Sequence, residues 1–170
     1  MIKILTVLIS VLVILPAGVL AEEGGSAMKL TSTAFKHNGN IPIQYTCQGD
    51  DINPPLSISD IPEGTKSLAL IIDDPDAPSK TWVHWVVFNI PVTTEIQENI
   101  VPGKQGYNDF GRNDYGGPCP PSGTHRYFHK LYALNKVLGL GEGITKSELE
   151  AAMKGNILAQ AELIGLYKKK

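Results

Sequence analysis

The chain beyond Met28 consists of short apolar or alternating runs separated by turn-forming residues. Leu68 to Ile72 is a continuous apolar run of strand length, and acids and prolines follow it in residues 73–78. Residues 82–89 alternate with the period of a strand, which predicts one face formed by Trp82, His84, Val86 and Phe88. We therefore expect two neighbouring strands joined by a functional loop, with a histidine that faces away from Trp85.

The remaining pattern predicts further short strands and one late helix. Strand-like runs lie in residues 28–35, 41–46, 56–58 and 126–133. Alternation in the last run, together with the histidine before it, predicts one face formed by His125, Tyr127, His129 and Leu131. Thr145 with Glu148 forms a capping box ahead of a helix of roughly two turns. Residues 157–167 predict a further helical turn and a strand. These elements indicate a mostly β fold of two packed antiparallel sheets with a short C-terminal helix.

Two connections stand out between these elements. Residues 95–101 are polar and predict an exposed connection. Residues 102–125 form the longest stretch without hydrophobic periodicity, and a loop of this length in a compact domain is usually functional or disordered. Its two tyrosines, its Phe110 and its four prolines favour an ordered loop.

Composition indicates one globular domain, because 42% of the 170 residues are hydrophobic and 19% are charged. The formal net charge of −2 argues against nucleic acid as a partner. Residues 1–21 predict a secretory signal, since Lys3 precedes a long uncharged run and small residues lead up to Ala21. A retained membrane anchor is the alternative. Residues 22–27 would then be a polar linker and residues 28–170 the folded domain, exported to the periplasm or the extracellular space.

Three pieces of the chain carry candidate chemistry. Asp74 and Asp76 follow one strand, His84 lies in the next, and His125 with Tyr127 follows a glycine turn. Adjacent glycines allow backbone amides to approach an anion, and imidazoles can donate to the same anion. The two acids suit a ligand's ammonium group, so together these residues predict a site for a zwitterion. The alternative for each residue taken singly is structural, because a loop Asp often caps its own turn and a strand His often lies in the core.

The sequence gives less support to a metal site or to a catalytic nucleophile. A metal site could use the ligand types of Asp74, Asp76, His84 and His125, but the close spacing of a metal motif is lacking. Cys119 or Ser122 could be a nucleophile beside His125, but prolines occupy the positions where a nucleophile elbow needs a strand-to-helix turn. The residues therefore predict no cofactor, no metal and no catalytic group.

Four segments, in this order, resemble the signature of the phosphatidylethanolamine-binding protein family, also called Raf kinase inhibitor proteins. They are Asp74-Pro75-Asp76-Ala77-Pro78, Trp82-Val83-His84-Trp85, Gly116-Gly117-Pro118-Cys119-Pro120-Pro121 and Gly123-Thr124-His125-Arg126-Tyr127. Cys47-Gln48-Gly49 and Pro54-Pro55-Leu56 are similar to the bacterial and archaeal branch of the family. The resemblance implies two antiparallel sheets with a C-terminal helical element. It also implies a small cavity that binds phosphate, acetate or a phosphorylethanolamine head group.

Carried over by motif, the resemblance implies ligand-binding roles for eight residues. They are Asp74, Asp76, Trp82, His84, Gly117, Pro118, His125 and Tyr127. It also implies a cis peptide bond in the loop after the first acids, with Ala77–Pro78 as the first candidate. Cys47 and Cys119 are the only cysteines, and an even count in an exported chain favours a disulfide between them, with free thiols as the alternative.

Three functional hypotheses follow. The first is a binding protein for a small anionic or phosphate-bearing ligand, such as a lipid head group. The second is a regulator of another protein, a kinase or a hydrolase, although the segments that contact kinases in eukaryotic relatives are partly missing here. The third is a hydrolase in which His84 or His125 acts as a general base. Edge strands and exposed aromatic side chains leave a homodimer open.

Overall fold

The computed structural model describes residues 27–170, so the predicted signal segment and nearly all of the predicted linker lie outside the described residues. Within this range the chain forms nine strands, one 3₁₀ helix and one α-helix. They are β1 (Lys29–Thr31), β2 (Gly39–Asn40), η1 (Ile43–Tyr45), β3 (Leu56–Ser59), β4 (Ser67–Asp74), β5 (Trp82–Ile90), β6 (Glu95–Ile96), β7 (Lys104–Gln105), β8 (Thr124–Leu134), α1 (Lys146–Met153) and β9 (Ile157–Lys168). No helix between residues 27 and 170 is long and apolar enough to cross a membrane.

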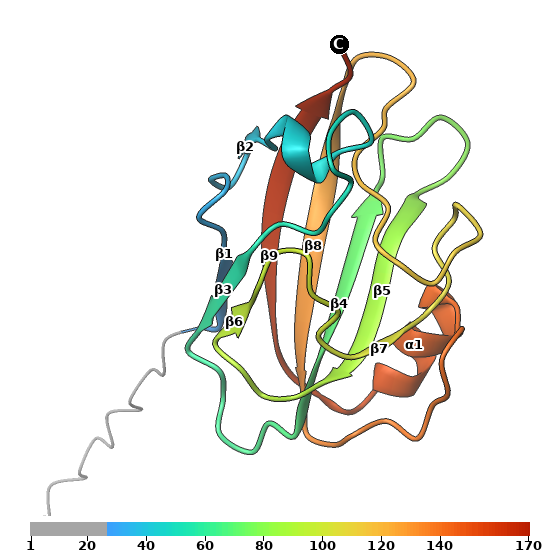
Figure 1. Cartoon of the computed structure of the whole chain (residues 1–170). Coiled ribbons are helices and arrows are strands. Elements are labelled where there is room, and N and C mark those ends of the chain that lie inside the picture. The colour runs from blue at the N-terminus through green and yellow to red at the C-terminus, as the bar shows by residue number, and fades with distance from the viewer. Residues whose placement is uncertain (1–26) are drawn as a thin grey trace, which may run out of the picture.

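The strands form two sheets, which confirms the predicted fold class. The large sheet has the order β2-β9-β8-β4-β5-β7, and the small sheet has the order β1-β3-β6 (Figure 1). All strand pairs are antiparallel except the short pair of β2 with β9. The four long central strands of the large sheet therefore run side by side, and the loops that precede or follow them gather at its two ends.

Both faces of β4 are buried, which explains its continuous apolar run. On one face Leu70 packs with Leu56 and Ile96 of the small sheet in the larger core cluster. On the other face Ile71 packs with Leu149 and Met153 of α1 in a second cluster (Figure 1). A strand covered on both sides reads as an unbroken hydrophobic stretch, because neither set of alternate side chains meets water.

The first residues of β5 do not lie on the sides of the sheet that the sequence predicted. Ile72 of β4 pairs with Trp85, but Asp73 pairs with Val83, so His84 is an extra residue in a β-bulge. The bulge turns His84 toward the side of Trp85, whereas Val86 and Phe88 pack against the α1 side. The predicted common face for His84, Val86 and Phe88 is therefore wrong, because strict alternation does not continue through a bulge.

Three other expectations need correction. Residues 43–45 form η1 instead of continuing a strand from residue 41. Residues 95–96 form β6, which adds buried Ile96 to the core, within the connection predicted to be exposed. Residues 157–168 form one long strand without a helical turn, paired with β8 along its length. Within this strand Gly165 permits close packing, because a Cβ there would lie 2.5 Å from Ile41 Cγ1.

The predicted capping box is confirmed at the start of α1. The Thr145 backbone N–H donates to Glu148 Oε2 over 2.7 Å, and Glu148 N–H donates to Thr145 Oγ1 over 3.3 Å. Both bonds satisfy backbone donors that the first helical turn leaves free. They anchor the short helix that covers the second face of the large sheet.

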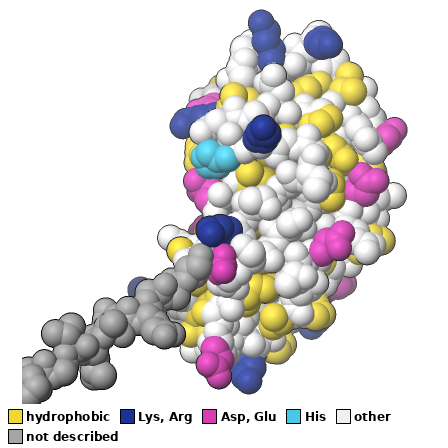
Figure 2. All heavy atoms as spheres, turned by 90° about the vertical axis from the view of Figure 1, so that its left-hand side faces the viewer, with side chains coloured by type: hydrophobic (Ala, Val, Ile, Leu, Met, Phe, Trp, Pro, Cys, Tyr) yellow, Lys and Arg dark blue, Asp and Glu magenta, His cyan; other side chains and the backbone are white. Residues whose placement is uncertain are grey.

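Surface charge follows the near-neutral composition on the side of β1, β2 and β3. Figure 2 shows this side, where acidic and basic side chains lie interspersed with apolar ones. Mixed charge of this kind produces no extended field of one sign.

Candidate functional site

A small hollow lies at the end of the large sheet where β4 ends and where β5 and β8 begin. Its volume is about 270 Å³. The long loop before β8 and the loop after β4 lie close together at this end (Figure 1). Eleven residues line the hollow: Asp74, Ala77, Pro78, Ser79, Trp82, His84, Phe110, Cys119, Pro120, Pro121 and Tyr127.

Larger hollows lie elsewhere in the described part of the chain, but none gathers more than one of the predicted ligand-binding residues. One, of about 410 Å³, lies over β8 and β9 beside Lys130 and Glu162, and another, of about 620 Å³, lies between residues 40–43 and the C-terminal lysines. A third, of about 330 Å³, is lined by Gly117 and Arg112, and a fourth, of about 320 Å³, lies beside β1. The smaller hollow is the candidate site because it combines buried titratable groups with an aromatic wall.

Asp74 and His125 form a buried pair at the base of the site. His125 Nδ1 lies 2.7 Å from Asp74 Oδ2, and the Asp76 backbone N–H donates to Asp74 Oδ1 over 2.8 Å. Both side chains are almost fully buried. Because a carboxylate accepts, the proton of the pair lies on Nδ1 of the imidazole, and the bond fixes the orientation of the ring.

Asp76 is turned away from the hollow. Its carboxylate accepts from the Arg126 backbone N–H and Nε–H, each over 2.9 Å, and from Nη2–H over 2.7 Å. The Arg126 hydrogen bonds lower the pKa of Asp76, although partial burial opposes them. Asp76 therefore joins the loop after β4 to the first residues of the strand β8. Its predicted contact with a ligand stays a prediction.

His84 is buried beside the hollow, and its hydrogen bond determines its tautomer. His84 Nδ1 lies 2.6 Å from the carbonyl oxygen of Gly116, which can only accept. The neutral ring therefore carries its proton on Nδ1 and presents an unprotonated Nε2. Burial lowers the pKa of His84, while the bond to Gly116 and the charge of Asp74 oppose that shift. At neutral pH the ring is uncharged, and Nε2 is an acceptor.

Aromatic side chains form the wall of the hollow. The His84 ring meets the edge of Tyr127 at 5.1 Å between centroids, and Trp82 meets Phe110 at 5.5 Å with an interplanar angle of 74°. Burial, followed by the charge of Asp74, raises the pKa of Tyr127 above its ordinary value, so its hydroxyl stays protonated. Within residues 27–170 this O–H has no acceptor. It is a free donor at the hollow.

Gly117 and Pro118 lie behind the wall and not on it. The Gly117 N–H donates to Asp51 Oδ1 over 2.7 Å, and the Pro118 carbonyl accepts from the Cys47 N–H over 3.2 Å. A Cβ on Gly117 would lie 2.6 Å from Asp51 Oδ1, so the glycine permits a close approach of chain to chain. In the predicted cradle of glycine amides, the Gly117 N–H is thus directed at Asp51, and the Gly116 N–H donates to the His84 carbonyl over 3.0 Å. A role of Gly117 or Pro118 in ligand contact stays a prediction.

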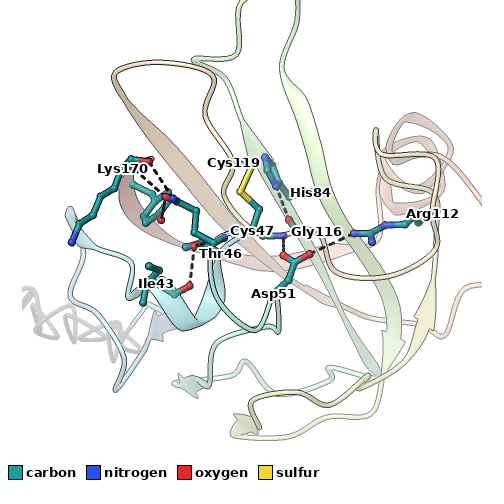
Figure 3. Close-up of a disulfide and its surroundings, with 12 residues drawn as sticks. Ile43, Thr46, Cys47, Asp51, His84, Arg112, Gly116, Cys119 and Lys170 are labelled. Atoms are coloured by element: carbon teal, nitrogen blue, oxygen red, sulfur yellow. Dashed lines mark hydrogen bonds and ion pairs between the residues drawn. A yellow bond between two sulfur atoms is a disulfide. The ribbon is translucent and has the colours of Figure 1, made fainter.

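The predicted disulfide is present between Cys47 and Cys119, and Cys119 lines the hollow. Figure 3 shows the bridge beside His84, whose ring meets the Gly116 carbonyl, with Asp51 between the glycine turn and Arg112. The bridge connects positions 72 residues apart, so the loop after η1 supports the wall of the hollow. Ala77–Pro78 is a trans peptide bond, which corrects the expected cis bond in this loop.

The structure thus brings Asp74, Trp82, His84 and Tyr127 together on the hollow, with His125 directly behind Asp74. Sequence reasoning missed Phe110 and the prolines at 120 and 121, which also line it. A signal for Phe110 existed, since it is an apolar residue in the long loop without periodicity. Among residues 27–170, no group of three or more His, Cys, Asp or Glu side chains is arranged to hold a metal ion.

Comparison with known proteins supports one family. A family model described as phosphatidylethanolamine-binding protein matches residues 31–168. A UPF0098 protein of Methanothermobacter thermautotrophicus is 53% identical over 150 residues, which cover 84% of this chain and 99% of that protein. A UPF0098 protein of Aquifex aeolicus is 52% identical over 160 residues, which cover 88% of this chain and 94% of that protein.

Solved structures agree with the sequence matches. A phosphatidylethanolamine-binding protein homolog of Chlamydia trachomatis superposes with a TM-score of 0.82 at 46% identity, covering 85% of this chain and 99% of that one. The YbcL protein of E. coli, described as a new member of the mammalian family, superposes with a TM-score of 0.79 at 31% identity, covering 85% of this chain and all of the other.

Proposed function

This chain belongs to the phosphatidylethanolamine-binding protein family, and we propose that its hollow binds a small ligand with an anionic, phosphate-bearing head group. The observation that carries the proposal is the convergence of Asp74, His84 and Tyr127, each almost fully buried, on one small hollow. Buried polar groups that converge on a hollow with apolar walls are typical of ligand sites.

The side chains of the site suit a phosphate that carries a proton. Tyr127 offers an O–H donor, whereas the neutral His84 offers an acceptor at Nε2. A phosphate oxygen can accept from Tyr127 while a P–OH group donates to Nε2. Alternatively His84 takes up the proton and donates to a phosphate oxygen. In either case one proton lies between the phosphate and His84, because the nearby Asp74 carboxylate disfavours a second negative charge.

Isothermal titration calorimetry with inorganic phosphate and O-phosphorylethanolamine tests the proposal. Wild type should bind both ligands, and His84→Gln should weaken binding by about tenfold to a hundredfold, the effect of losing a charged hydrogen bond. His125→Ala should also weaken binding, because it removes the partner that orients Asp74. His37→Ala is the matched control, since His37 is exposed in the turn before β2. Equal heats for wild type and both site variants would refute an anion site here. Turnover of phosphoesters that His84→Gln abolishes would indicate a hydrolase instead.

A second candidate function, regulation of a protein partner, is favoured by exposed aromatic side chains. Tyr107 is 49% exposed and Phe110 is 40% exposed on the loop that borders the hollow. Aromatic residues are enriched at protein interfaces. A partner captured by wild type, released by phosphorylethanolamine and not captured by Tyr107→Ser would support this function. Capture unaffected by both the ligand and the substitution would count against it.

The disulfide supports the proposal that the domain is exported. Structural disulfides form and persist in oxidising compartments such as the periplasm or the extracellular space. The expected cleavage after Ala21 is checked by the mass of the protein recovered from its native cell envelope or medium. A mass that includes residues 1–21 would favour the retained anchor.

A further inference from the structure

The lining of the hollow supplies no positive charge for a phosphate. Of its eleven residues none is Lys or Arg, and Asp74 is the one carboxylate. The cations nearby have other partners, since Arg126 is bound by Asp76 and Lys80 lies 2.6 Å from Asp109 Oδ1. Arg112 Nε lies 3.1 Å from Asp114 Oδ1. A phosphate-bearing ligand that fits this environment carries its own positive charge.

The side chains in the wall of the hollow indicate which kind of positively charged ligand group fits there. Trp82 and Phe110 stand nearly perpendicular, and besides Ser79 with its single hydroxyl the lining groups of their loops are carbon-rich: Ala77, Pro78, Pro120 and Pro121. A primary ammonium has three N–H donors that need acceptors. Asp74 accepts already from His125 and from the Asp76 amide, which leaves this wall poor in acceptors. A quaternary ammonium has no N–H and binds favourably to aromatic faces.

Both aromatic rings already lie beside protein cations. Lys80 Nζ lies 5.6 Å from the centroid of Trp82, and Arg112 Cζ lies 5.7 Å from that of Phe110. Neither cation lines the hollow, and each is paired with an acid, Asp109 or Asp114. The rings therefore carry no uncompensated positive charge that would repel a ligand cation.

We propose that the hollow selects a phosphocholine-type head group, with the phosphate at His84 and Tyr127 and the trimethylammonium group against Trp82 and Phe110. The inference rests on the proposed anion site and adds its ligand class and its specificity-determining residues. Both free phosphocholine and the head group of a choline phospholipid have this chemistry.

Calorimetry with four ligands tests this specificity: inorganic phosphate, O-phosphorylethanolamine, phosphocholine and 3,3-dimethylbutyl phosphate. The last replaces the quaternary nitrogen by carbon and so keeps the shape without the charge. Phosphocholine should bind about tenfold more tightly than phosphorylethanolamine and than the neutral analogue, as expected for a desolvated cation on aromatic faces.

Substitutions of the aromatic wall test whether Trp82 and Phe110 cause the preference for phosphocholine. Phe110→Leu and Trp82→Leu should each reduce the preference for phosphocholine, measured as the ratio of its affinity to that of phosphorylethanolamine, at least threefold. Tyr107→Leu is the matched control, because Tyr107 is an exposed aromatic on the same loop that does not line the hollow. Its preference should equal that of wild type. Circular dichroism and thermal unfolding confirm that each variant is folded.

Each result has one meaning. Absence of phosphate binding in wild type would remove the proposed function itself. Phosphate binding without a preference for phosphocholine over phosphorylethanolamine would overturn only the inference, as would equal affinity for the neutral analogue. Flotation with phosphatidylcholine vesicles, competed by free phosphocholine, would identify the lipid as the source, whereas binding of free phosphocholine alone would identify a soluble ligand.

Discussion

Adjacent residues in this protein can serve opposite faces of the sheet, as the last two residues of β4 show. Asp73 is fully buried on the α1 side and lies 2.8 Å from Lys130 Nζ and 2.5 Å from Lys146 Nζ. Asp74 faces the hollow and orients His125. Because successive side chains of a strand point to opposite sides, one acid joins the helix to the sheet and the other belongs to the site.

At the scale of single residues, the protonation of the His84 ring predicts that anion affinity increases as the pH falls. Burial lowers the pKa of His84, so the free protein is neutral at this ring at pH 7, whereas a bound anion favours the protonated ring. Affinity should therefore increase as the pH decreases, by up to about tenfold per pH unit for one coupled proton.

Sulfate is the suitable probe because it stays fully ionised between pH 5 and 8, so that only the protein titrates. Calorimetry across this range in buffers of different ionisation enthalpy measures the proton uptake. His84→Gln should lose most of the pH dependence. Sulfate affinity that is constant with pH in wild type would contradict the assignment of the proton to His84.

At the scale of elements, the long loop before β8 is ordered by a few side-chain bonds to its own backbone. The buried Asn108 amide donates to the Asp114 carbonyl over 2.9 Å and accepts from the amides of Phe110 and Arg112, each over 3.0 Å. Asp109 binds both backbone groups of Val83 at the start of β5. The loop thus presents Phe110 at the hollow with little regular secondary structure.

α1 supplies a prediction at this scale. Thr145→Ala removes the side-chain acceptor of the capping box and should lower the free energy of unfolding by about 1 kcal/mol, without changing ligand affinity. Urea denaturation measures the loss, and calorimetry with phosphate measures the affinity. The exposed Thr94→Ala serves as the control in β-rich surroundings. A loss no larger than that of the control would mean that the cap contributes nothing.

At the scale of the whole molecule, the site depends on segments far apart in the chain. The disulfide joins residues 72 apart, and Tyr115 O–H donates to the Tyr45 carbonyl over 2.8 Å beside it. Residues 45–47, at the end of η1 and just after it, and residues 115–119 are therefore held together by both a covalent bond and a buried hydrogen bond. This connection supports the wall of the hollow that Cys119 contributes.

The double variant Cys47→Ser/Cys119→Ser should lose stability and some affinity. In the chain-entropy model, closing a loop of this length constrains the unfolded chain by about 4 kcal/mol, which is the upper value for the loss. Phosphate affinity should also decrease, because the segment 116–121 gains freedom that binding must remove. Urea denaturation and calorimetry with and without a dithiol reductant measure both effects. The reductant should lower the stability of wild type and leave the variant unchanged; equal denaturation midpoints for all four samples would exclude a stabilising bridge.

Much of the fold follows from local patterns. The apolar run of residues 68–72 indicates a strand buried on both faces, and Thr145 with Glu148 marks the start of the helix. The four motifs that resemble the phosphatidylethanolamine-binding proteins predicted the family, and four of the residues that they single out line the hollow: Asp74, Trp82, His84 and Tyr127. Such signals are readable because periodicity, capping and turn chemistry involve residues that are neighbours in the chain.

What only the tertiary structure decided is where polar groups find their partners. The bulge at His84 depends on the register with β4, the Gly117 amide meets Asp51 at a distance of 66 residues in the chain, and Asp76 meets Arg126 at 50. A sequence states which donors and acceptors exist, but their pairing depends on which segments the folded core brings together. For this reason the motifs pointed to four residues of the hollow, whereas the directions of the side chains were decided by the tertiary structure.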